Sequence, residues 1–173
     1  MRLTSCAVGI RMLVMPSAVI LGAVILGAAI PGAAAERIVL FDVELVNSSL
    51  EPTRADEEAR IAMTGRLLRE GFAEREGFEV LDQDALAEEV EQVGYLRGCN
   101  GCELKMAERI DADLAGLAWV QKVSNLILNI NLQVREVGTG RLVYAGTVDI
   151  RGNTDDSWQR GVRYLLKNRI FRE

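Results

Sequence analysis

The sequence predicts an α/β fold, a single-domain sandwich in which helices pack on one mixed sheet. Apolar residues recur at every second position in some segments, as in strands, and at every third or fourth position in others, as in amphipathic helices. These segments follow one another in the order β-α-β-α-α-β-β-β-α, which suits a sheet covered by helices. No repeat or long linker divides residues 36–173, and about 138 residues suit one domain.

Residues 1–35 have the composition of a secretory signal peptide. Arg2 and Arg11 give a positive start, no acidic residue precedes Glu36, and small residues follow an apolar run over residues 12–30. We therefore expect export to the periplasm with cleavage after residue 35. The alternative is a retained anchor, since an apolar run of this length can cross a bilayer. No cysteine directly follows the run, so the segment does not read as a lipoprotein signal.

Charge and composition exclude several classes of function. The chain carries 20 Lys and Arg against 25 Asp and Glu, and it has no histidine. Without a run of basic residues we expect no nucleic-acid partner. Without histidine, Ser-His-Asp and Cys-His catalysis and histidine metal ligands are excluded. We expect no catalytic residues, no metal and no cofactor, and hence not an enzyme.

The first element after the leader is a predicted strand over residues 38–45, where a fully apolar run changes to alternation. A loop follows over residues 47–52. Acidic residues 56–58 then open a helix that extends to about Glu70, because negative charge is favourable at a helix start. Its inward stripe is predicted to be Ala59, Ala62, Met63 and Leu67, widened by Ile61, Leu68 and Phe72.

A short strand is predicted over residues 78–81, and Asp82 is a suitable N-cap for a second helix. A loop over residues 94–101 leads to a third, shorter helix from about Cys102 to Ile110. The apolar residues of the second helix are Leu86, Val90 and Val93.

Three strands follow in close succession. Residues 114–123 are apolar and are expected at the centre of the sheet. Residues 126–135 alternate regularly between apolar and polar, which predicts one buried face. Residues 138–140 are typical of a hairpin loop before a return strand over residues 142–150. The polar positions of the alternating strand are expected to be solvated, with a docking surface as the alternative: Asn129, Asn131, Gln133 and Arg135.

A last helix begins after a break at residues 151–153, with Thr154 or Asp155 as its N-cap. The spacing of Trp158, Val162 and Leu165 places these side chains on one inward stripe. Hydrogen-bonding groups are concentrated at the helix start, where a cap is the favoured interpretation. The alternative is a surface that binds a ligand or partner, formed by Arg151, Asn153, Thr154, Asp155, Asp156 and Ser157.

Cys99 and Cys102 are the only cysteines after the leader, and a lone pair in an oxidising compartment is expected to form a disulfide. We interpret it as a structural clip, although so short a loop contributes little stability. The alternative is thiol-disulfide exchange, with Cys99 as the nucleophile near a helix N-terminus. Glu103 stands where a haem-attachment motif requires histidine.

Asp42 and Glu44 flank Val43 and are expected on one face of the first strand. Two carboxylates suit acid-base chemistry or a cation. No further ligand set accompanies them, so the sequence assigns them no role.

Four segments of the chain resemble a family of uncharacterised exported bacterial proteins, catalogued as a domain of unknown function. They are Phe41-Asp42-x-Glu44-Leu45, Cys99-x-x-Cys102, Trp119 to Leu128, and Arg151 to Trp158. The resemblance covers almost all of the chain after the leader. Members of that family tend to occur in methanol-oxidising and other quinoprotein-using bacteria, which points weakly to such a pathway.

The layout is also distantly similar to the N-terminal α/β domain of TolB and to CsgG-like periplasmic domains. The shared features are Phe41-Asp42 at the end of the opening strand, Ala112-Asp113 before a long strand, and the hairpin turn at residues 137–140. Those domains act in envelope assembly and binding, so the resemblance implies a role without catalysis.

Two functions remain from the sequence. The favoured one is a non-catalytic periplasmic binding or envelope-assembly accessory protein, whose partner is another periplasmic or envelope protein. The membrane would be contacted only through residues 1–35, if they are not cleaved. The alternative is a thiol-disulfide redox accessory protein of a periplasmic quinoprotein system that oxidises methanol or another alcohol.

Overall fold

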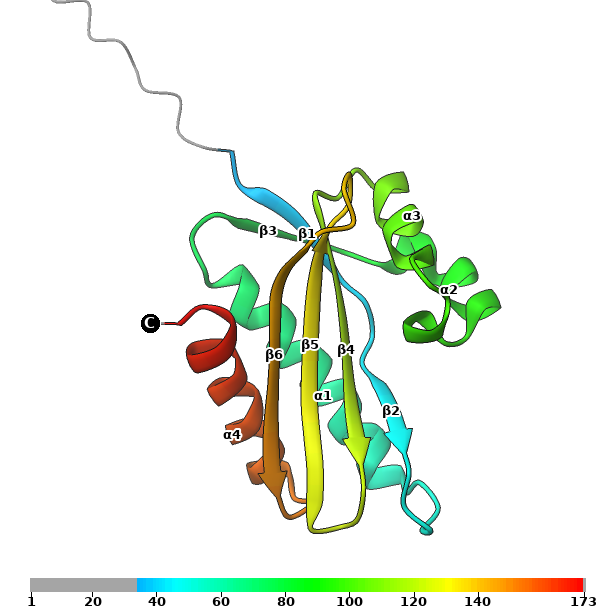
Figure 1. Cartoon of the computed structure of the whole chain (residues 1–173), viewed down its shortest axis with the longest axis vertical. Helices are drawn as coiled ribbons and strands as arrows, with labels where there is room; N and C mark the ends of the chain where they lie inside the picture. The colour runs from blue at the N-terminus through cyan, green and yellow to red at the C-terminus, as the bar shows by residue number, and fades with distance from the viewer. Residues whose placement is uncertain (1–33, 173) are drawn as a thin grey trace, which may run out of the picture. The chain divides into compact units, whose positions relative to one another are not determined.

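The computed structural model describes residues 34–172, so the predicted leader lies outside the described residues except for its last two positions. Six strands form one mixed sheet (Figure 1). They are β1 (Glu36–Leu40), β2 (Glu44–Asn47), β3 (Phe78–Leu81), β4 (Leu114–Lys122), β5 (Ile127–Glu136) and β6 (Leu142–Arg151). The helices are α1 (Ala55–Ala73), α2 (Ala87–Val93), α3 (Cys102–Arg109) and α4 (Asp155–Leu165), with short 3-10 turns at Asp84–Leu86 and Leu96–Gly98 and a π-turn at Leu166–Ile170.

The strand order is β3-β1-β4-β5-β6, and β2 also pairs with β4. The pairs β1–β3, β1–β4 and β2–β4 are parallel, whereas β4, β5 and β6 form an antiparallel meander. The predicted α/β fold with one mixed sheet is therefore confirmed. Within residues 34–172, no helix combines the length and the apolar character needed to cross a membrane.

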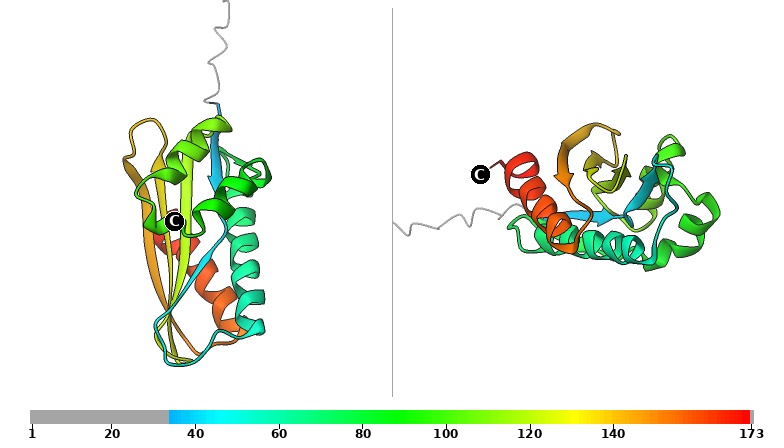
Figure 2. Two further views of the ribbon diagram at one scale, coloured as in Figure 1. Left: turned by 90° about the vertical axis from the view of Figure 1, so that its right-hand side faces the viewer. Right: turned by 90° about the horizontal axis from the view of Figure 1, so that it is seen from below.

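Two hydrophobic cores lie on opposite faces of the sheet. On one face, α1 and α4 run along the same side of the strands (Figure 2) and enclose the larger core, in which Leu68, Phe72, Trp158 and Val162 are fully buried or nearly so. On the other face, α3 and the two 3-10 turns cover a smaller core. Its buried members are Val39, Phe41, Leu86, Leu96, Met106, Ala107, Ala112 and Ala115.

The expectation of one strand over residues 38–45 is wrong, because a bulge separates β1 from β2. Leu40 pairs with Gly116 and Glu44 pairs with Trp119, so three residues of this segment lie opposite two residues of β4. The extra residue reverses which positions face which core. Before the bulge the odd-numbered positions face the smaller core, and after it Val43 and Leu45 face the larger one.

The predicted stripe of α1 is partly wrong. Ala59 and Ala62 are exposed, while Met63 and Leu67 are partly buried as expected. The helix is turned so that an acidic residue of its first turn, Glu57, points inward. The fully or largely buried positions are Glu57, Thr64, Gly65, Leu68 and Phe72.

The remaining elements agree closely with the sequence. Asp82 accepts a hydrogen bond from the backbone N–H of Asp84 at 3.0 Å and so caps the turn that leads into α2. Leu86 is buried, whereas Val93 is exposed because α2 ends at the protein surface. The helix α3 and the inward stripe of α4 lie where the sequence predicts them.

Candidate functional site

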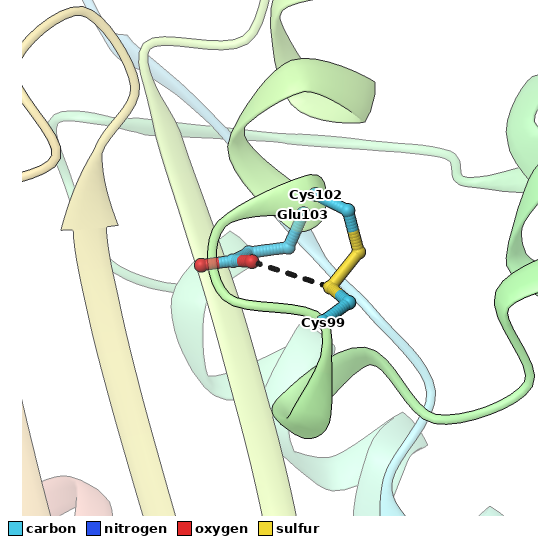
Figure 3. Close-up of side chains that lie close together, drawn as sticks. All are labelled: Cys99, Cys102 and Glu103. Atoms are coloured by element: carbon cyan, nitrogen blue, oxygen red, sulfur yellow. Dashed lines mark hydrogen bonds between the residues drawn. A yellow bond between two sulfur atoms is a disulfide. The ribbon is translucent and has the colours of Figure 1, made fainter.

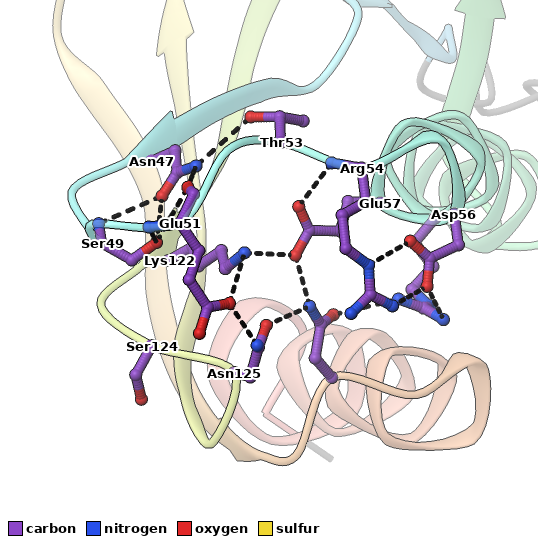
Figure 4. Close-up of polar contacts among 12 residues, drawn as sticks. Asn47, Ser49, Glu51, Thr53, Arg54, Asp56, Glu57, Lys122, Ser124 and Asn125 are labelled. Carbon is purple, nitrogen blue, oxygen red and sulfur yellow. Dashed lines mark hydrogen bonds and ion pairs between the residues drawn. The ribbon is translucent and has the colours of Figure 1, made fainter.

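A polar cluster closes one end of the domain, where the end of β4, the start of α1 and the loop after β6 meet. Lys122, the last residue of β4, is fully buried, and its Nζ lies 2.6 Å from Oε1 of Glu57. The backbone N–H of Arg54 donates to the other oxygen of Glu57 at 3.0 Å (Figure 4). Glu51 lies at the solvent side of the cluster, 3.9 Å from the same Nζ.

The environment of Glu57 favours its charged form. Burial by itself raises the pKa of this carboxyl group, but hydrogen bonds from Lys122, the Arg54 backbone and Asn153 outweigh burial, so its pKa lies below the usual glutamate value. The ion pair therefore exists at neutral pH as two compensated charges inside the domain.

Asn153 is the centre of this cluster. Its Nδ2 donates to Glu57 at 2.5 Å, and its Oδ1 accepts from Nε1 of Trp158 at 2.9 Å and from Arg60 at 3.2 Å. A second, longer bond from Nδ2 reaches Asn125 at 3.4 Å. The amide thus uses its donors and its acceptor inside the protein, which makes Asn153 a structural link between α1, β4 and α4.

Thr154 and Ser157 form the cap of α4. Thr154 Oγ1 accepts from the backbone N–H of Ser157 at 3.3 Å, and the backbone N–H of Thr154 donates to Ser157 Oγ at 3.2 Å. Ser157 Oγ also donates to the carbonyl of Gly152 at 2.6 Å, and the residue is buried. This reciprocal arrangement is a capping box, so the cap that the sequence favoured is confirmed.

The other predicted surface residues point to solvent. The side chains of Asp155 and Asp156 are each 70% exposed, and they pair with Arg60 at 2.7 Å and Arg160 at 2.6 Å. Arg151 is exposed at the end of β6 and has no carboxylate within ion-pair distance among residues 34–172. The predicted surface thus divides into an internal half and an outward half.

A cleft of about 580 Å³ lies between β6 and α4, beside the outward half of that surface. Because β6 is the last strand of the sheet, one of its edges has no partner strand. Tyr164, 49% exposed, lies in this cleft with the guanidinium of Arg169 4.8–6 Å class distance over its ring, at 5.9 Å. The lining residues that carry polar groups are Thr147, Asp149, Arg151, Ser157, Arg160, Tyr164 and Arg169.

The second candidate site is the disulfide between Cys99 and Cys102, whose Cα atoms are 5.7 Å apart (Figure 3). Cys102 is the first residue of α3, and both cysteines are half-buried. Glu103, only 2% exposed, places Oε1 3.0 Å from Arg135 and Oε2 3.9 Å from Sγ of Cys99. The three side chains are close enough to hold a metal ion if the disulfide were reduced.

The remaining sequence candidates do not form a site of their own. Asp42 and Glu44 line one small cleft but take different partners: Asp42 pairs with Arg69 at 3.3 Å, and Glu44 accepts from the backbone N–H of Arg97 at 3.2 Å.

The polar row on β5 is less solvated than expected. Asn131 is buried, and its Oδ1 accepts from Thr147 on β6 at 2.8 Å. Arg135 is partly buried and holds Glu103, while Gln133 is exposed as predicted. Asn129 donates to Asp149, so cross-strand pairing rather than water satisfies most of this row.

Sequence reasoning missed the roles of Glu57, Lys122 and Glu103. Lys122 closes an otherwise apolar run, and an isolated lysine there is a weak signal of a buried ion pair. Glu57 looks like one of three ordinary acids at a helix start. Glu103 was considered only as the residue that replaces a haem-motif histidine.

Comparison with known proteins supplies a family and a fold. Residues 36–170 match the family DUF3280, described as a protein of unknown function (DUF2380). Among curated proteins, none matches this chain.

Three solved structures illustrate the fold. The LpoB C-terminal domain from Salmonella enterica is 16% identical, with 70% of this chain and 86% of that one covered and a TM-score of 0.51. The hypothetical protein CT253 from Chlamydia trachomatis is 12% identical, with coverages of 77% and 94% and a TM-score of 0.49. TolB from Acinetobacter baumannii is 7% identical, with coverages of 77% and 28% and a TM-score of 0.43.

Proposed function

Because the chain belongs to the DUF3280 family, whose function is unknown, we propose its role from the surface that its fold builds. It is an accessory protein of the bacterial envelope that binds an extended, acidic segment of another envelope protein in the cleft between β6 and α4. The cleft has no catalytic part in this role. The observation that carries the proposal is the unpaired edge of β6 beside arginines that lack acidic partners.

The edge of β6 is suited to strand addition. The strand is ten residues long, contains no proline, and has only two charged residues, Asp149 and Arg151, both near its end. Natural edge strands that do not bind a partner are usually short, charged or interrupted. An extended segment that pairs with this edge would gain main-chain hydrogen bonds and would direct alternate side chains toward α4.

The charges of the cleft select an acidic segment. Arg151, Arg160 and Arg169 line it, against Asp149 as the lining carboxylate. Of the three, only Arg160 has a carboxylate partner among residues 34–172, and Arg169 contacts the ring of Tyr164 instead. A positive cleft on a chain of net charge −5 favours negatively charged partners by long-range attraction.

An envelope location rests on the predicted leader. The fold that the domain shares with the LpoB C-terminal domain is compatible with it. The similarity to CsgG-like domains and the connection to methanol oxidation stay predictions from the sequence.

The test uses a labelled ten-residue peptide of alternating Glu and Val, with a peptide of alternating Lys and Val as its counterpart. We expect the acidic peptide to bind, and Arg151→Glu combined with Arg169→Glu to weaken it by roughly tenfold or more, which corresponds to about 1.4 kcal/mol. The matched control is Arg163→Glu, an exposed arginine of α4 that does not line the cleft. Equal binding of both peptides, or an equal loss in the control, contradicts the proposal.

A further inference from the structure

The carboxylate of Glu103 lacks a hydrogen-bond donor on one oxygen while the disulfide is closed. Oε1 is paired with Arg135, but the neighbour given for Oε2 within residues 34–172 is Sγ of Cys99, at 3.9 Å. A disulfide sulfur carries no proton and cannot donate to that oxygen. Because Glu103 is almost completely buried, the oxidised state leaves a polar atom poorly satisfied.

Reduction supplies the missing donor. When the bond between Cys99 and Cys102 opens and Cys99 becomes a thiol, its S–H can donate to Oε2 without movement of a backbone element. A hydrogen bond to an ionised acceptor is among the stronger ones. The reduced state therefore gains an interaction that the oxidised state lacks, and this raises the tendency of the disulfide to accept electrons.

Cys102 has a different advantage, because it is the first residue of α3. The N-terminus of a helix stabilises a negative charge and lowers the pKa of a thiol placed there. A thiol of low pKa is the better leaving group in disulfide exchange. The two sulfurs are thus unlike: Cys102 is suited to leave as a thiolate, and Cys99 is suited to end as a hydrogen-bonded thiol.

We propose that Cys99 and Cys102 form an exchangeable disulfide that oxidises a pair of thiols in a partner protein, with Glu103 as the positioning residue for Cys99. This activity goes beyond binding at the β6 edge and does not depend on it. The sequence alone favoured a structural clip, and the placement of Glu103 is the observation that argues for exchange.

The exchange has two steps. A thiolate of the partner attacks Sγ of Cys99, a partner–Cys99 disulfide forms, and the Cys99–Cys102 bond breaks with Cys102 leaving as a thiolate. The partner's second thiolate then attacks the partner sulfur of that mixed disulfide, and Cys99 leaves, takes a proton from water and donates it to Glu103. The partner loses two electrons and two protons to become a disulfide, and this chain becomes a dithiol.

The surroundings leave room for such an approach. Both cysteines are half-buried rather than enclosed, and a small cleft of about 150 Å³ adjoins the loop between them. Arg97 and Arg135 line this cleft beside Glu103. Their positive charge favours the approach of a thiolate.

The test measures how easily the disulfide is reduced by mixtures of reduced and oxidised glutathione. The full chain is used with Cys6→Ser, so that only Cys99 and Cys102 remain, and the thiols are trapped by alkylation and counted by mass spectrometry. The reference is the isolated peptide Cys-Asn-Gly-Cys, which has the same loop. We expect the protein's disulfide to be reduced more readily than that of the peptide, because the fold stabilises the thiol form.

Variants of the acid separate positioning from mere stability. Glu103→Leu, which has no acceptor, should move the equilibrium constant toward the disulfide by about tenfold, and Glu103→Gln should fall between it and the native chain. Glu108→Gln, on the exposed side of the same helix, should leave the constant unchanged. Thermal melts of each variant confirm that the domain is folded when the constant is measured.

A direct assay completes the test. One equivalent of a reduced peptide with a Cys-x-x-Cys pair should be oxidised as one protein disulfide is reduced, and Cys102→Ser should allow a stable mixed disulfide on Cys99. A disulfide harder to reduce than the reference peptide, or one insensitive to Glu103→Leu, would show a structural clip and overturn the proposal. Peptide binding at the β6 edge is measured separately and is unaffected by either result.

Discussion

The Nζ of Lys122 lies 2.6 Å from a carboxylate oxygen of Glu57, and neither side chain reaches solvent. This pair joins the last residue of β4 to the first turn of α1. Asn153 extends it to the start of α4, because its amide bonds both to Glu57 and to the indole of Trp158. Three elements distant in sequence are thus held at one end of the domain by a continuous polar network.

Removing one member of the buried pair should be costly. Lys122→Met leaves an uncompensated charge on Glu57, and we expect a loss of about 3–5 kcal/mol in the free energy of unfolding. Combining Lys122→Met with Glu57→Gln should cost less than the sum of the two single changes. Urea unfolding of the three variants measures this, and strictly additive losses would show that the two side chains do not interact.

The low pKa of Glu57 predicts a loss of stability in acid. Its pKa in the folded state lies below the usual glutamate value, so its contribution is fully present above the unfolded pKa and is lost as the pH falls through the folded one. Denaturant titrations between neutral pH and strongly acidic pH should show this decline. In Glu57→Gln the slope over that range should be shallower, and an unchanged slope would assign the decline to other carboxylates.

Trp158 should be the most sensitive residue of α4. Its indole is fully buried and its N–H is bonded to Asn153, so Trp158→Ala should cost about 3–5 kcal/mol. Asp155→Asn and Asp156→Asn should cost about 0.3–1 kcal/mol each, since both side chains are largely exposed at the helix start. Thermal melts compare them, and a Trp158→Ala protein that melts like the native one would contradict the packing of α4.

Gly161 marks the closest approach of α4 to the sheet. A Cβ at this position would lie 2.5 Å from Cγ2 of Ile150 and 2.9 Å from Cδ1 of Ile130. Gly161→Ala should therefore destabilise the domain by about 1–3 kcal/mol, although alanine is ordinarily favoured over glycine in helices. Gly138→Ala is the control, because a Cβ there meets no atom within 4 Å. Calorimetry of both variants decides between overpacking and helix propensity.

Processing at the start of the chain is the remaining prediction. If residues 1–35 form a cleaved signal peptide, N-terminal sequencing of the exported protein should begin at or near Glu36. An intact Met1 on a membrane-bound protein would support the retained anchor instead.

The sequence predicts elements better than it predicts what connects them. The meander of β4, β5 and β6 follows from alternation and turn residues, and the cap at Thr154 follows from residue types within one helical turn. The bulge at residues 41–43 could not be predicted, because it appears only when the segment is aligned with β4. The pair of Lys122 and Glu57 was missed for a related reason: each charge is unremarkable locally, and their contact is a product of tertiary structure.

The topology of β1 also limits the order in which the domain can fold. Its partners come much later in the chain, 42 residues on for Glu36 with Phe78 and 76 residues on for Ile38 with Leu114. The β4–β6 meander closes through short loops and therefore needs far less chain ordering before its contacts form. We expect the folding nucleus in the C-terminal half, with the central strand docking last. During synthesis the N-terminal half remains without its sheet partners, which suits a polypeptide expected to cross a membrane before it folds.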